Sequence, residues 1–432
     1  MIGITLKSVP LYLVTFLEVG RLSWSWGLTL LSLISIVLVT YVSRQTFTTT
    51  SQYWIFFTRA LLLISLILCF NVNNIILFYT FFELRALIIF LIVLSLGYQP
   101  ERLEASLYLL LFTVFTSLPF FGVVLILRTE RGLVEFTLLK NNRSRGLFPE
   151  RRLFSLMLVI GVLTKFPMYF VHIWLPKAHV EASTTGSILL AGVLLKLGRF
   201  GIGRLLGLLR LTRFTQFLAF FALVGGALIR ILCVRITDLK MLVAYSSVAH
   251  MSLVITGILS LSFLGQIGGL AIRISHGITS SALFFGAGRL YSQSNSRLSL
   301  LNRGCSVWAP RFTFFWFIFC CRNIGTPPSL NFWAEVILLF SIVRRRMLRV
   351  VGLGVSLFFA VAFNIVIYSM SQSQKEVRAL NFSLNFRLKD QGVFLIHLIW
   401  LLLLTFFLDI MFKYSENSNS AIKYLNPSPF PS

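Results

Sequence analysis

Charged residues are scarce in this chain. Asp, Glu, Lys and Arg make up 12% of its 432 residues, and only 14 residues are acidic. Soluble domains carry about 25% charged residues. Hydrophobic residues make up 57% of the chain, and the mean hydropathy is +0.85. Because so apolar a chain lacks the polar residues that would cover it in water, it is predicted to be a polytopic membrane protein.

Cysteine is rare as well. The five cysteines form no Cys-x-x-Cys pair, so the spacing predicts neither a zinc site nor an iron-sulfur cluster. The chain also lacks a flavin or nucleotide fingerprint. We therefore expect no cofactor in this chain.

Acidic residues are far outnumbered by basic ones, which gives a net charge of +25. In a soluble protein this excess would suggest nucleic-acid binding. Here most basic residues lie between apolar runs, where they can reach lipid headgroups, and no soluble domain offers a basic surface. We expect membrane lipids, cardiolipin among them, and no nucleic acid as partners.

Long apolar runs are abundant. Runs of about 20 residues, ended by Pro, Gly or charge, predict about twelve membrane-spanning helices. They lie at 27–43, 54–72, 74–97, 105–127, 153–175, 187–209, 214–234, 242–263, 265–288, 309–343, 348–370 and 392–412. The fold class is therefore all-α, a polytopic transmembrane helical bundle.

Two of these runs contain helix breakers. The run 309–343 is too long for one straight span and holds Gly-Thr-Pro-Pro at 325–328, and Lys165 is followed by Pro167. Lipid does not tolerate free backbone groups, so each break must be buried in protein, as in transporters built from two repeats. We predict two inverted repeats, each with a broken helix. The predicted parts are an N-terminal region with one span at 1–53, a first repeat bundle at 54–209, a second at 210–370, and a last helix with a polar tail at 371–432.

Six of the ionisable residues inside the apolar runs are the candidate functional residues. They are Glu83, Lys165, Lys196, His250, His276 and Glu335. An ion at the hydrocarbon centre costs about 2.5–3.5 kcal/mol or more, so such residues are functional candidates by default. Carboxylates, amines and imidazoles can exchange protons near neutral pH once burial and neighbours tune them, which favours proton transfer.

Structural roles are the alternative for several polar residues. A lone histidine in a membrane helix more often fills a helix–helix hydrogen bond. Arginines near helix ends can extend to the interface, and this alternative stays open for Arg59, Arg199, Arg204, Arg230 and Arg273. Arg85 follows Glu83 by two residues, about 200° around a helix. Glu83 is therefore expected to face the protein and Arg85 to point elsewhere.

Five stretches are more specific than any generic motif. They are LTKFPMYFVHIWLPKAHVEASTTGSILLAGVLLKLGRFGIGR at 163–204, RITDLKMLVAYSSVAHMSLV at 235–254, GYQPERLEASLYLLLFT at 97–113, SHGITSSALFF at 275–285 and TPPSLNFWAEV at 326–336. In composition and order they resemble the antiporter-like membrane subunits of proton-pumping NADH:quinone oxidoreductase, respiratory complex I. The resemblance covers most of the chain from about residue 74 to residue 343.

The resemblance implies roles for the candidate residues. Glu83 matches the glutamate that faces the neighbouring subunit, and Lys165 matches the lysine at the first broken helix; this pair would gate proton uptake. Lys196 matches the central lysine of the next helix. His276 matches the histidine that links two half-channels, and Glu335 matches the ionisable residue of the second broken helix.

His250 aligns with a further histidine of the same polar axis. The implied function is a core membrane-arm subunit that carries protons along this axis while other subunits oxidise NADH with quinone. NAD, FMN, iron-sulfur clusters and ubiquinone would be bound by those other subunits. Neighbouring antiporter-like subunits would be partners. The first repeat would then take up protons and the second would release them.

Two other functions remain as alternatives. A subunit of a multi-subunit cation/proton antiporter shares the ancestral fold, and a scaffold with a decayed channel is disfavoured because every axis position is ionisable. The compact, Phe-rich chain without a recognisable targeting segment predicts the mitochondrial inner membrane; a bacterial plasma membrane is the alternative. The chain departs from the family by reaching Glu83 early, which implies missing N-terminal helices, and by carrying Arg199 close to Lys196.

Overall fold

The fold is built from helices. The computed structural model describes residues 27–42, 49–97, 99–132, 135–136, 152–206, 212–260, 262–343, 349–372 and 388–406. Within these ranges the only pairings between extended segments are two isolated β-bridges, Asn74 with Glu135 and Asp238 with Leu298. The all-α prediction is confirmed.

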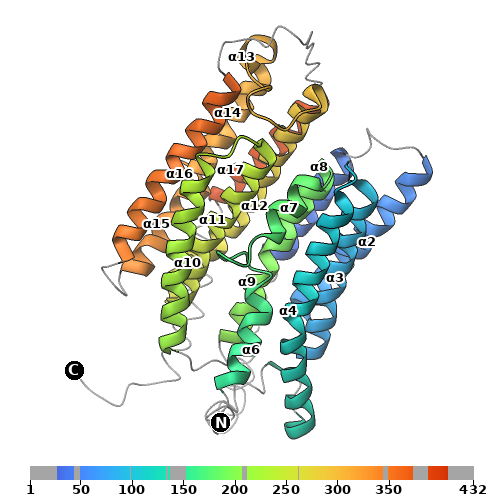
Figure 1. The fold of residues 1–432 in the computed structure, drawn as a ribbon, viewed down its shortest axis with the longest axis vertical. Coiled ribbons are helices and arrows are strands. Elements are labelled where there is room, and N and C mark those ends of the chain that lie inside the picture. The colour runs from blue at the N-terminus through green and yellow to red at the C-terminus, as the bar shows by residue number, and fades with distance from the viewer. Residues whose placement is uncertain are drawn as a thin grey trace, which may run out of the picture.

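The long helices run roughly along the longest axis of the molecule, with the N-terminal helices on one side and the C-terminal ones on the other (Figure 1). The elements are α2 (Thr49–Asn71), α3 (Ile75–Leu96), α4 (Arg102–Arg131), α6 (Arg152–Leu163), α7 (Trp174–Glu181), α8 (Thr184–Leu189), the π-helical turn η2 (Leu190–Leu194), α9 (Leu195–Leu206), α10 (Thr212–Cys233), α11 (Leu239–Leu259), α12 (Phe263–Ser294), α13 (Cys305–Trp308), α14 (Pro310–Ile324), α15 (Leu330–Val343), α16 (Arg349–Gln372) and α17 (Leu388–Phe406). A further helix covers Gly27–Val42.

In the part of the chain that the structure describes, eight segments are long and apolar enough to cross a membrane, and each overlaps one of the twelve predicted spans. They are Tyr53–Asn71, Ile75–Leu96, Arg102–Thr129, Thr184–Ile202, Gln216–Cys233, Leu239–Leu259, Val350–Gln372 and Leu388–Phe406. The other four predicted spans correspond to the short apolar helix Gly27–Val42, to α12, and to the two broken helices. The chain is a multi-pass membrane protein.

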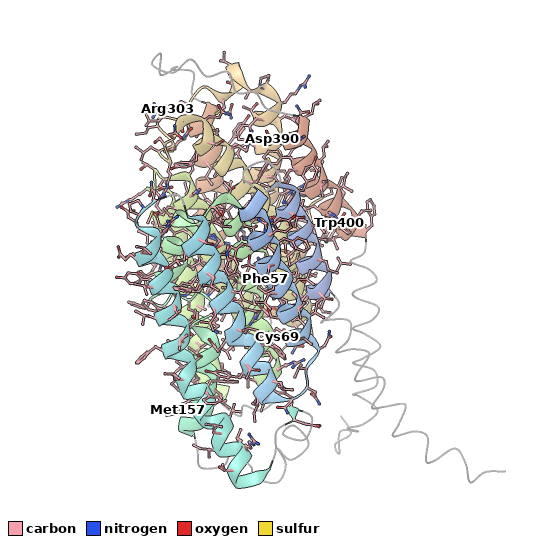
Figure 2. The ribbon with its side chains drawn as sticks, turned by 90° about the vertical axis from the view of Figure 1, so that its right-hand side faces the viewer. Phe57, Cys69, Met157, Arg303, Asp390 and Trp400 are labelled. Atoms are coloured by element: carbon pink, nitrogen blue, oxygen red, sulfur yellow. The ribbon has the colours of Figure 1, made fainter. Side chains whose placement is uncertain are left out.

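The centre of the bundle is formed by α8, η2 and α9 together with α11 and α12. In the spans Thr184–Ile202 and Leu239–Leu259, 94% of the residues are buried inside the protein, against 28% in Leu388–Phe406. The outer helices expose apolar side chains instead, as Phe57 does on α2, which faces the viewer in Figure 2. Lipid covers such apolar faces at no cost, so polar residues are concentrated in the central helices.

The first predicted break is confirmed. Helix α6 ends at Leu163 and α7 begins at Trp174, and the chain between them, 164–173, is called the first break. The indole Nε1 of Trp174 donates to the carbonyl of Thr164 at 3.2 Å, and the Thr164 hydroxyl lies 2.7 Å from that of Thr116 on α4. Protein groups thus satisfy backbone that lipid would leave without partners.

The second predicted break is confirmed too. Helix α14 ends at Ile324 and α15 begins at Leu330, and residues 325–329 form the second break. Gly325 adopts a left-handed conformation, with φ at +85°, that favours glycine. Asn331 Nδ2 donates to the carbonyl of Arg322 across the break at 2.8 Å. The division into two inverted repeats stays a prediction.

Helices α11 and α12 approach each other closely at the turn that joins them. Gly257 lies near the end of α11, and Gly265 lies near the start of α12. Ser262 caps α12 by accepting a hydrogen bond from the backbone N–H of Gly265 at 3.1 Å. A Cβ added at Gly265 would overlap the backbone carbonyl of Gly257. Glycine is therefore required for the packing that places His250 and His276 side by side.

Replacing Gly265 by Ala is expected to destabilise this helix pair by about 1–3 kcal/mol, because the added methyl meets backbone rather than a flexible side chain. Gly354→Ala is the control, since nothing lies within 4 Å of the position of its added Cβ. The measurement is the thermal disassembly temperature of the membrane complex that contains the chain. Equal temperatures for the two variants would show that α11 and α12 do not pack this closely.

Candidate functional site

The six predicted residues lie on six different structural elements that meet in the interior. They are Glu83 on α3, Lys165 in the first break, Lys196 on α9, His250 on α11, His276 on α12 and Glu335 on α15. All except Glu83 are buried. These six residues are called the polar row.

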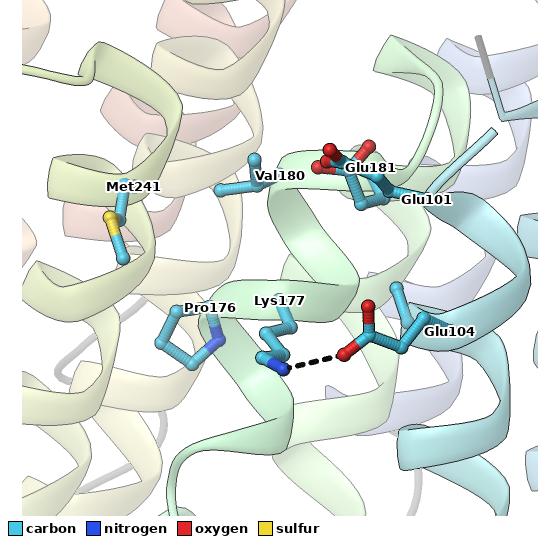
Figure 3. A pocket seen from close by; sticks show the side chains of 8 residues that line it. Glu101, Glu104, Pro176, Lys177, Val180, Glu181 and Met241 are labelled. Atoms are coloured by element: carbon cyan, nitrogen blue, oxygen red, sulfur yellow. Dashed lines mark hydrogen bonds and ion pairs between the residues drawn. The ribbon is translucent and has the colours of Figure 1, made fainter. Parts of the chain in front are cut away.

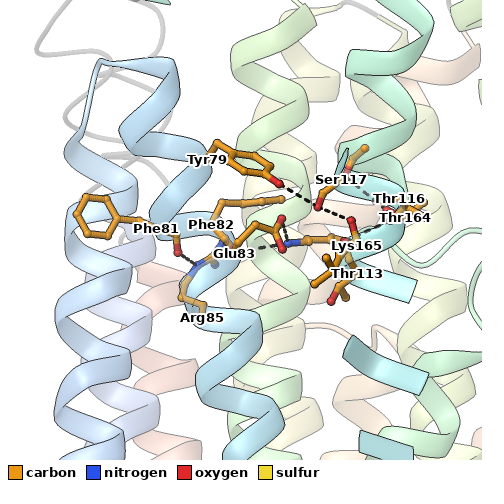
Figure 4. A network of polar contacts seen from close by, with 12 residues as sticks. Tyr79, Phe81, Phe82, Glu83, Arg85, Thr113, Thr116, Ser117, Thr164 and Lys165 are labelled. Carbon is orange, nitrogen blue, oxygen red and sulfur yellow. Dashed lines mark hydrogen bonds and ion pairs between the residues drawn. The ribbon is translucent and has the colours of Figure 1, made fainter. Parts of the chain in front are cut away.

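Lys165 and Glu83 form an ion pair at the first break (Figure 4). Lys165 Nζ lies 2.5 Å from Glu83 Oε1 and donates to the carbonyl of Phe82 at 3.4 Å. The ammonium also lies 4.0 Å from the centre of the Phe82 ring. Because the side chains are only 6% and 15% exposed, either member alone would be an uncompensated charge in a region of low polarity.

Lys196 occupies the centre of the bundle without a carboxylate beside it. Its side chain is 1% exposed, and Nζ donates to the carbonyl of Ala191 in the π-helical turn. No carboxylate among the described residues lies within 4.0 Å of Nζ. A π-helical turn frees carbonyls from the helical ladder, and π-turns inside helices often mark functional sites.

His276, His250 and Glu335 form a second cluster. The ring centres of His250 and His276 are 5.0 Å apart, and His250 Nδ1 lies 3.4 Å from Glu335 Oε1. Among the described residues, neither ring nitrogen of His276 has a hydrogen-bond partner. The alternative that His276 fills a helix–helix hydrogen bond is therefore wrong. Buried polar atoms without a protein partner are places where ordered water binds.

Lys196 and the residues next to it lie close to both the ion pair at Glu83 and the histidine cluster. A Cβ added at Gly198, two residues after Lys196, would lie 3.1 Å from the carbonyl carbon of Lys165. A Cβ added at Gly277, next to His276, would lie 3.0 Å from Lys196 Cε. The ion pair at Glu83, the central lysine and the histidine cluster are thus consecutive neighbours inside one bundle.

Hydroxyl groups surround the histidine cluster, but their protons are already used. Ser246, Ser247 and Ser281 each donate to a carbonyl one helical turn back. Thr279 and Ser280 both donate to the carbonyl of His276. These hydroxyl oxygens can still accept hydrogen bonds, so they can orient water but are committed as donors.

Several arginines do not follow the prediction of interfacial side chains. Three of them are buried, at 4%, 0% and 1% exposure: Arg59, Arg230 and Arg273. Arg204 is half-buried and donates to the carbonyls of Phe70 and Val72 at the end of α2. The side chain of Arg199 lies outside the described residues, so its expected crowding of Lys196 stays a prediction.

The prediction for Arg85 is wrong. Arg85 is 3% exposed, and its guanidinium turns back along α3 to donate to the carbonyls of Phe81 at 3.1 Å and Phe82 at 3.2 Å. The helical angle correctly separates it from Glu83, but a long side chain can bend back over its own preceding turn. Arg85 therefore shares the Phe82 carbonyl with Lys165 (Figure 4).

His179 on α7 is a further buried ionisable residue, in the stretch 163–204. Its ring stacks on Phe284 with centres 4.4 Å apart, and neither nitrogen has a hydrogen-bond partner in the described part of the chain. No group of three or more His, Cys, Asp or Glu that could hold a metal ion occurs in the ranges given above. In the sequence, the signal that points to His179 is its place in the stretch 163–204.

A small pocket of about 140 Å³ lies between α4, α7 and α11 (Figure 3). Two of its carboxylates are held in ion pairs: Lys177 Nζ is 3.0 Å from Glu104 Oε1, and Arg297 Nη1 is 3.0 Å from Glu181 Oε1. These pairs tie α7 to its neighbours on either side. The pocket is thus part of the scaffold that holds the end of the first break.

Because Glu83 and Lys165 form an ion pair, the stability losses from substituting each residue should not be additive. Lys165→Met or Glu83→Gln alone should each cost about 3–5 kcal/mol of stability, since each leaves an unpaired charge in the interior. The double variant should be more stable than the sum of the two losses implies. A double-mutant cycle on the thermal disassembly temperature measures this coupling, and additive losses would contradict the ion pair.

Comparison with known proteins agrees with this geometry. The family model for the transmembrane region of NADH:quinone oxidoreductases and Mrp antiporters matches residues 72–362. NADH-ubiquinone oxidoreductase chain 4 of Ceratitis capitata is 39% identical over 355 residues, which are 81% of this chain and 78% of that protein. The chain 4 protein of Lumbricus terrestris is 38% identical over 348 residues, 80% of this chain and 77% of that one.

Solved structures share the fold. A chain of respiratory complex I from Thermus thermophilus superposes with a TM-score of 0.80 at 22% identity, covering 93% of this chain and 85% of that one. A chain of the Mrp complex from Dietzia sp. gives a TM-score of 0.76 at 18% identity, covering 92% and 44%. The matched residues 72–362 contain the whole polar row. The chain therefore belongs to the NADH:quinone oxidoreductase/Mrp antiporter family of transmembrane proteins, in the group of NADH-ubiquinone oxidoreductase chain 4.

Proposed function

We propose that this chain conducts protons across the membrane along the polar row. It is a membrane-arm subunit of a proton-translocating NADH:quinone oxidoreductase, and its relatives are named NADH-ubiquinone oxidoreductase chain 4. The observation that carries the proposal is the order of neighbours in the row. Glu83 pairs with Lys165, the backbone of Lys165 packs against Gly198 close to Lys196, and Gly277 beside His276 packs against the Lys196 side chain. His250 then contacts both His276 and Glu335. Each of these groups can take up and release a proton.

The ion pair at the first break would control uptake. While Glu83 is ionised, its charge holds a proton on Lys165. Protonation of Glu83, or its withdrawal toward a neighbouring subunit, would leave the ammonium of Lys165 uncompensated and favour release of its proton inward. A charge change outside the chain would thus be converted into proton movement inside it.

The central lysine and the histidine cluster would carry the proton onward. Among the described residues, the acceptor for the Lys196 ammonium is the carbonyl of Ala191, so a proton held there is not trapped by a carboxylate. Among the described residues, neither ring nitrogen of His276 has a hydrogen-bond partner, so His276 offers the next acceptor. His250 follows, with its Nδ1 3.4 Å from Glu335 Oε1. A neutral imidazole accepts at one nitrogen and donates from the other, which suits transfer in steps.

The surroundings of the chain are part of the same proposal. We place it in the mitochondrial inner membrane, beside other membrane-arm and antiporter-like subunits and in contact with lipids such as cardiolipin. NAD, FMN, iron-sulfur clusters and ubiquinone belong to other subunits. The alternative, a cation/proton antiporter subunit, rests on the Mrp fold match at 18% identity, whereas chain 4 proteins of complex I are up to 39% identical.

Replacing Lys196 by Met tests the path at its centre. Proton pumping coupled to NADH oxidation should fall about tenfold or more, because a positioned proton-transfer group contributes ~10²-fold or more to such a step. Lys389→Met, which removes an exposed lysine from α17, is the matched control. Assembly is checked on a native gel. An assembled Lys196→Met complex that pumps as the control does would exclude Lys196 from the path.

A further inference from the structure

Buried arginines accompany the lysines of the polar row. Arg85 donates to the same Phe82 carbonyl as Lys165, and Arg273 Nη1 donates to the backbone carbonyl of Lys196 at 3.2 Å. The sequence placed these arginines outside the site. Arg273 is of greater interest, because Lys165 has Glu83 as a counter-charge and Lys196 has no comparable carboxylate.

The position of Arg273 is well defined. It lies on α12 one helical turn before His276, is 1% exposed, and donates from Nε to the carbonyl of Gly269 at 3.2 Å. Its other contact reaches across to α9, so one side chain joins the central helix of each half of the bundle. A guanidinium stays protonated in proteins, so Arg273 is a fixed positive charge in the interior.

The other charged or titratable groups around Lys196 do not offset this charge. Electrostatic neighbours of Lys196 are Arg273 and His276 on α12 and His179 on α7. Lys165 contributes its backbone where the first break meets Gly198. All of these side chains are cationic or neutral, so a proton on Lys196 is repelled by Arg273 and attracted by none of them.

We propose that Arg273 is a positioning residue for proton transfer, whose fixed charge keeps Lys196 from retaining a proton. The inference rests on the proposed proton path and adds one mechanistic element to it. Lys196 would hold a proton only briefly, and a proton arriving from the first break would be passed to the histidine cluster. The rate of transfer through the centre would then depend on the charge at position 273, not merely on a hydrogen bond there.

Three substitutions separate charge from hydrogen bonding. Arg273→Lys keeps the charge, Arg273→Gln keeps hydrogen-bond donors without charge, and Arg273→Met keeps neither. Proton pumping by the assembled complex is measured as a function of pH. Without the repulsion Lys196 stays protonated to higher pH, so the alkaline limb for Gln and Met should move up by about one pH unit. The Lys substitution should keep the original profile.

Controls distinguish this proposal from the proton path itself. Arg59→Met removes a buried guanidinium from α2 and should leave the profile in place. Combining Lys196→Met with Arg273→Gln should abolish any effect of the Arg273 change. If Lys196→Met pumps normally, the path is wrong; if Lys196→Met fails but Arg273→Gln keeps the original profile, only the role of Arg273 is wrong. Loss of assembly in both neutral variants would make Arg273 a folding residue and overturn the proposal.

Discussion

The structure depends on one constraint: polar groups inside the bundle find no partners in lipid, so the protein or water enclosed in it must supply them. The ion pair of Lys165 with Glu83 meets this constraint at the first break, where Trp174 also caps a free carbonyl. At the second break, Asn331 donates a hydrogen bond to the carbonyl of Arg322. Polar residues that would be costly elsewhere are therefore confined to the central helices, and that confinement produces a continuous row.

Much of the fold follows from the sequence because the membrane simplifies it. Apolar run length indicates the spans, and the breakers beside Lys165 and at 325–328 indicate the two interruptions. A proline alone does not decide this, because α4 continues through Pro119. Four predicted spans are not long, uniformly apolar helices: two are broken, Gly27–Val42 is short, and α12 is rich in Gly, Ser and Arg. Its membership of the bundle is decided by tertiary burial, which hydropathy does not measure.

The sequence predicted which residues form the site, but it did not predict all of the contacts that these residues and their neighbours make. A charge inside an apolar run is conspicuous, which is why the six residues of the polar row stand out. The directions of Arg85 and Arg273 were not predictable, because a long side chain chooses among carbonyls that only the folded neighbours supply. Likewise, spacing gives no sign that His250 and His276, 26 residues apart in sequence, have ring centres 5.0 Å apart.

The hydrogen bonds along the polar row have gaps: among the described residues, the ring nitrogens of His276 have no hydrogen-bond partner, and the Lys196 ammonium donates to the Ala191 carbonyl rather than to another member of the row. Proton transfer across such gaps requires water. The most direct measurement is therefore a structure of the assembled complex in which ordered waters are resolved. We expect waters hydrogen-bonded in sequence between Lys165, Lys196 and His276. A dry, apolar interval between Lys196 and His276 would contradict a proton path through this chain.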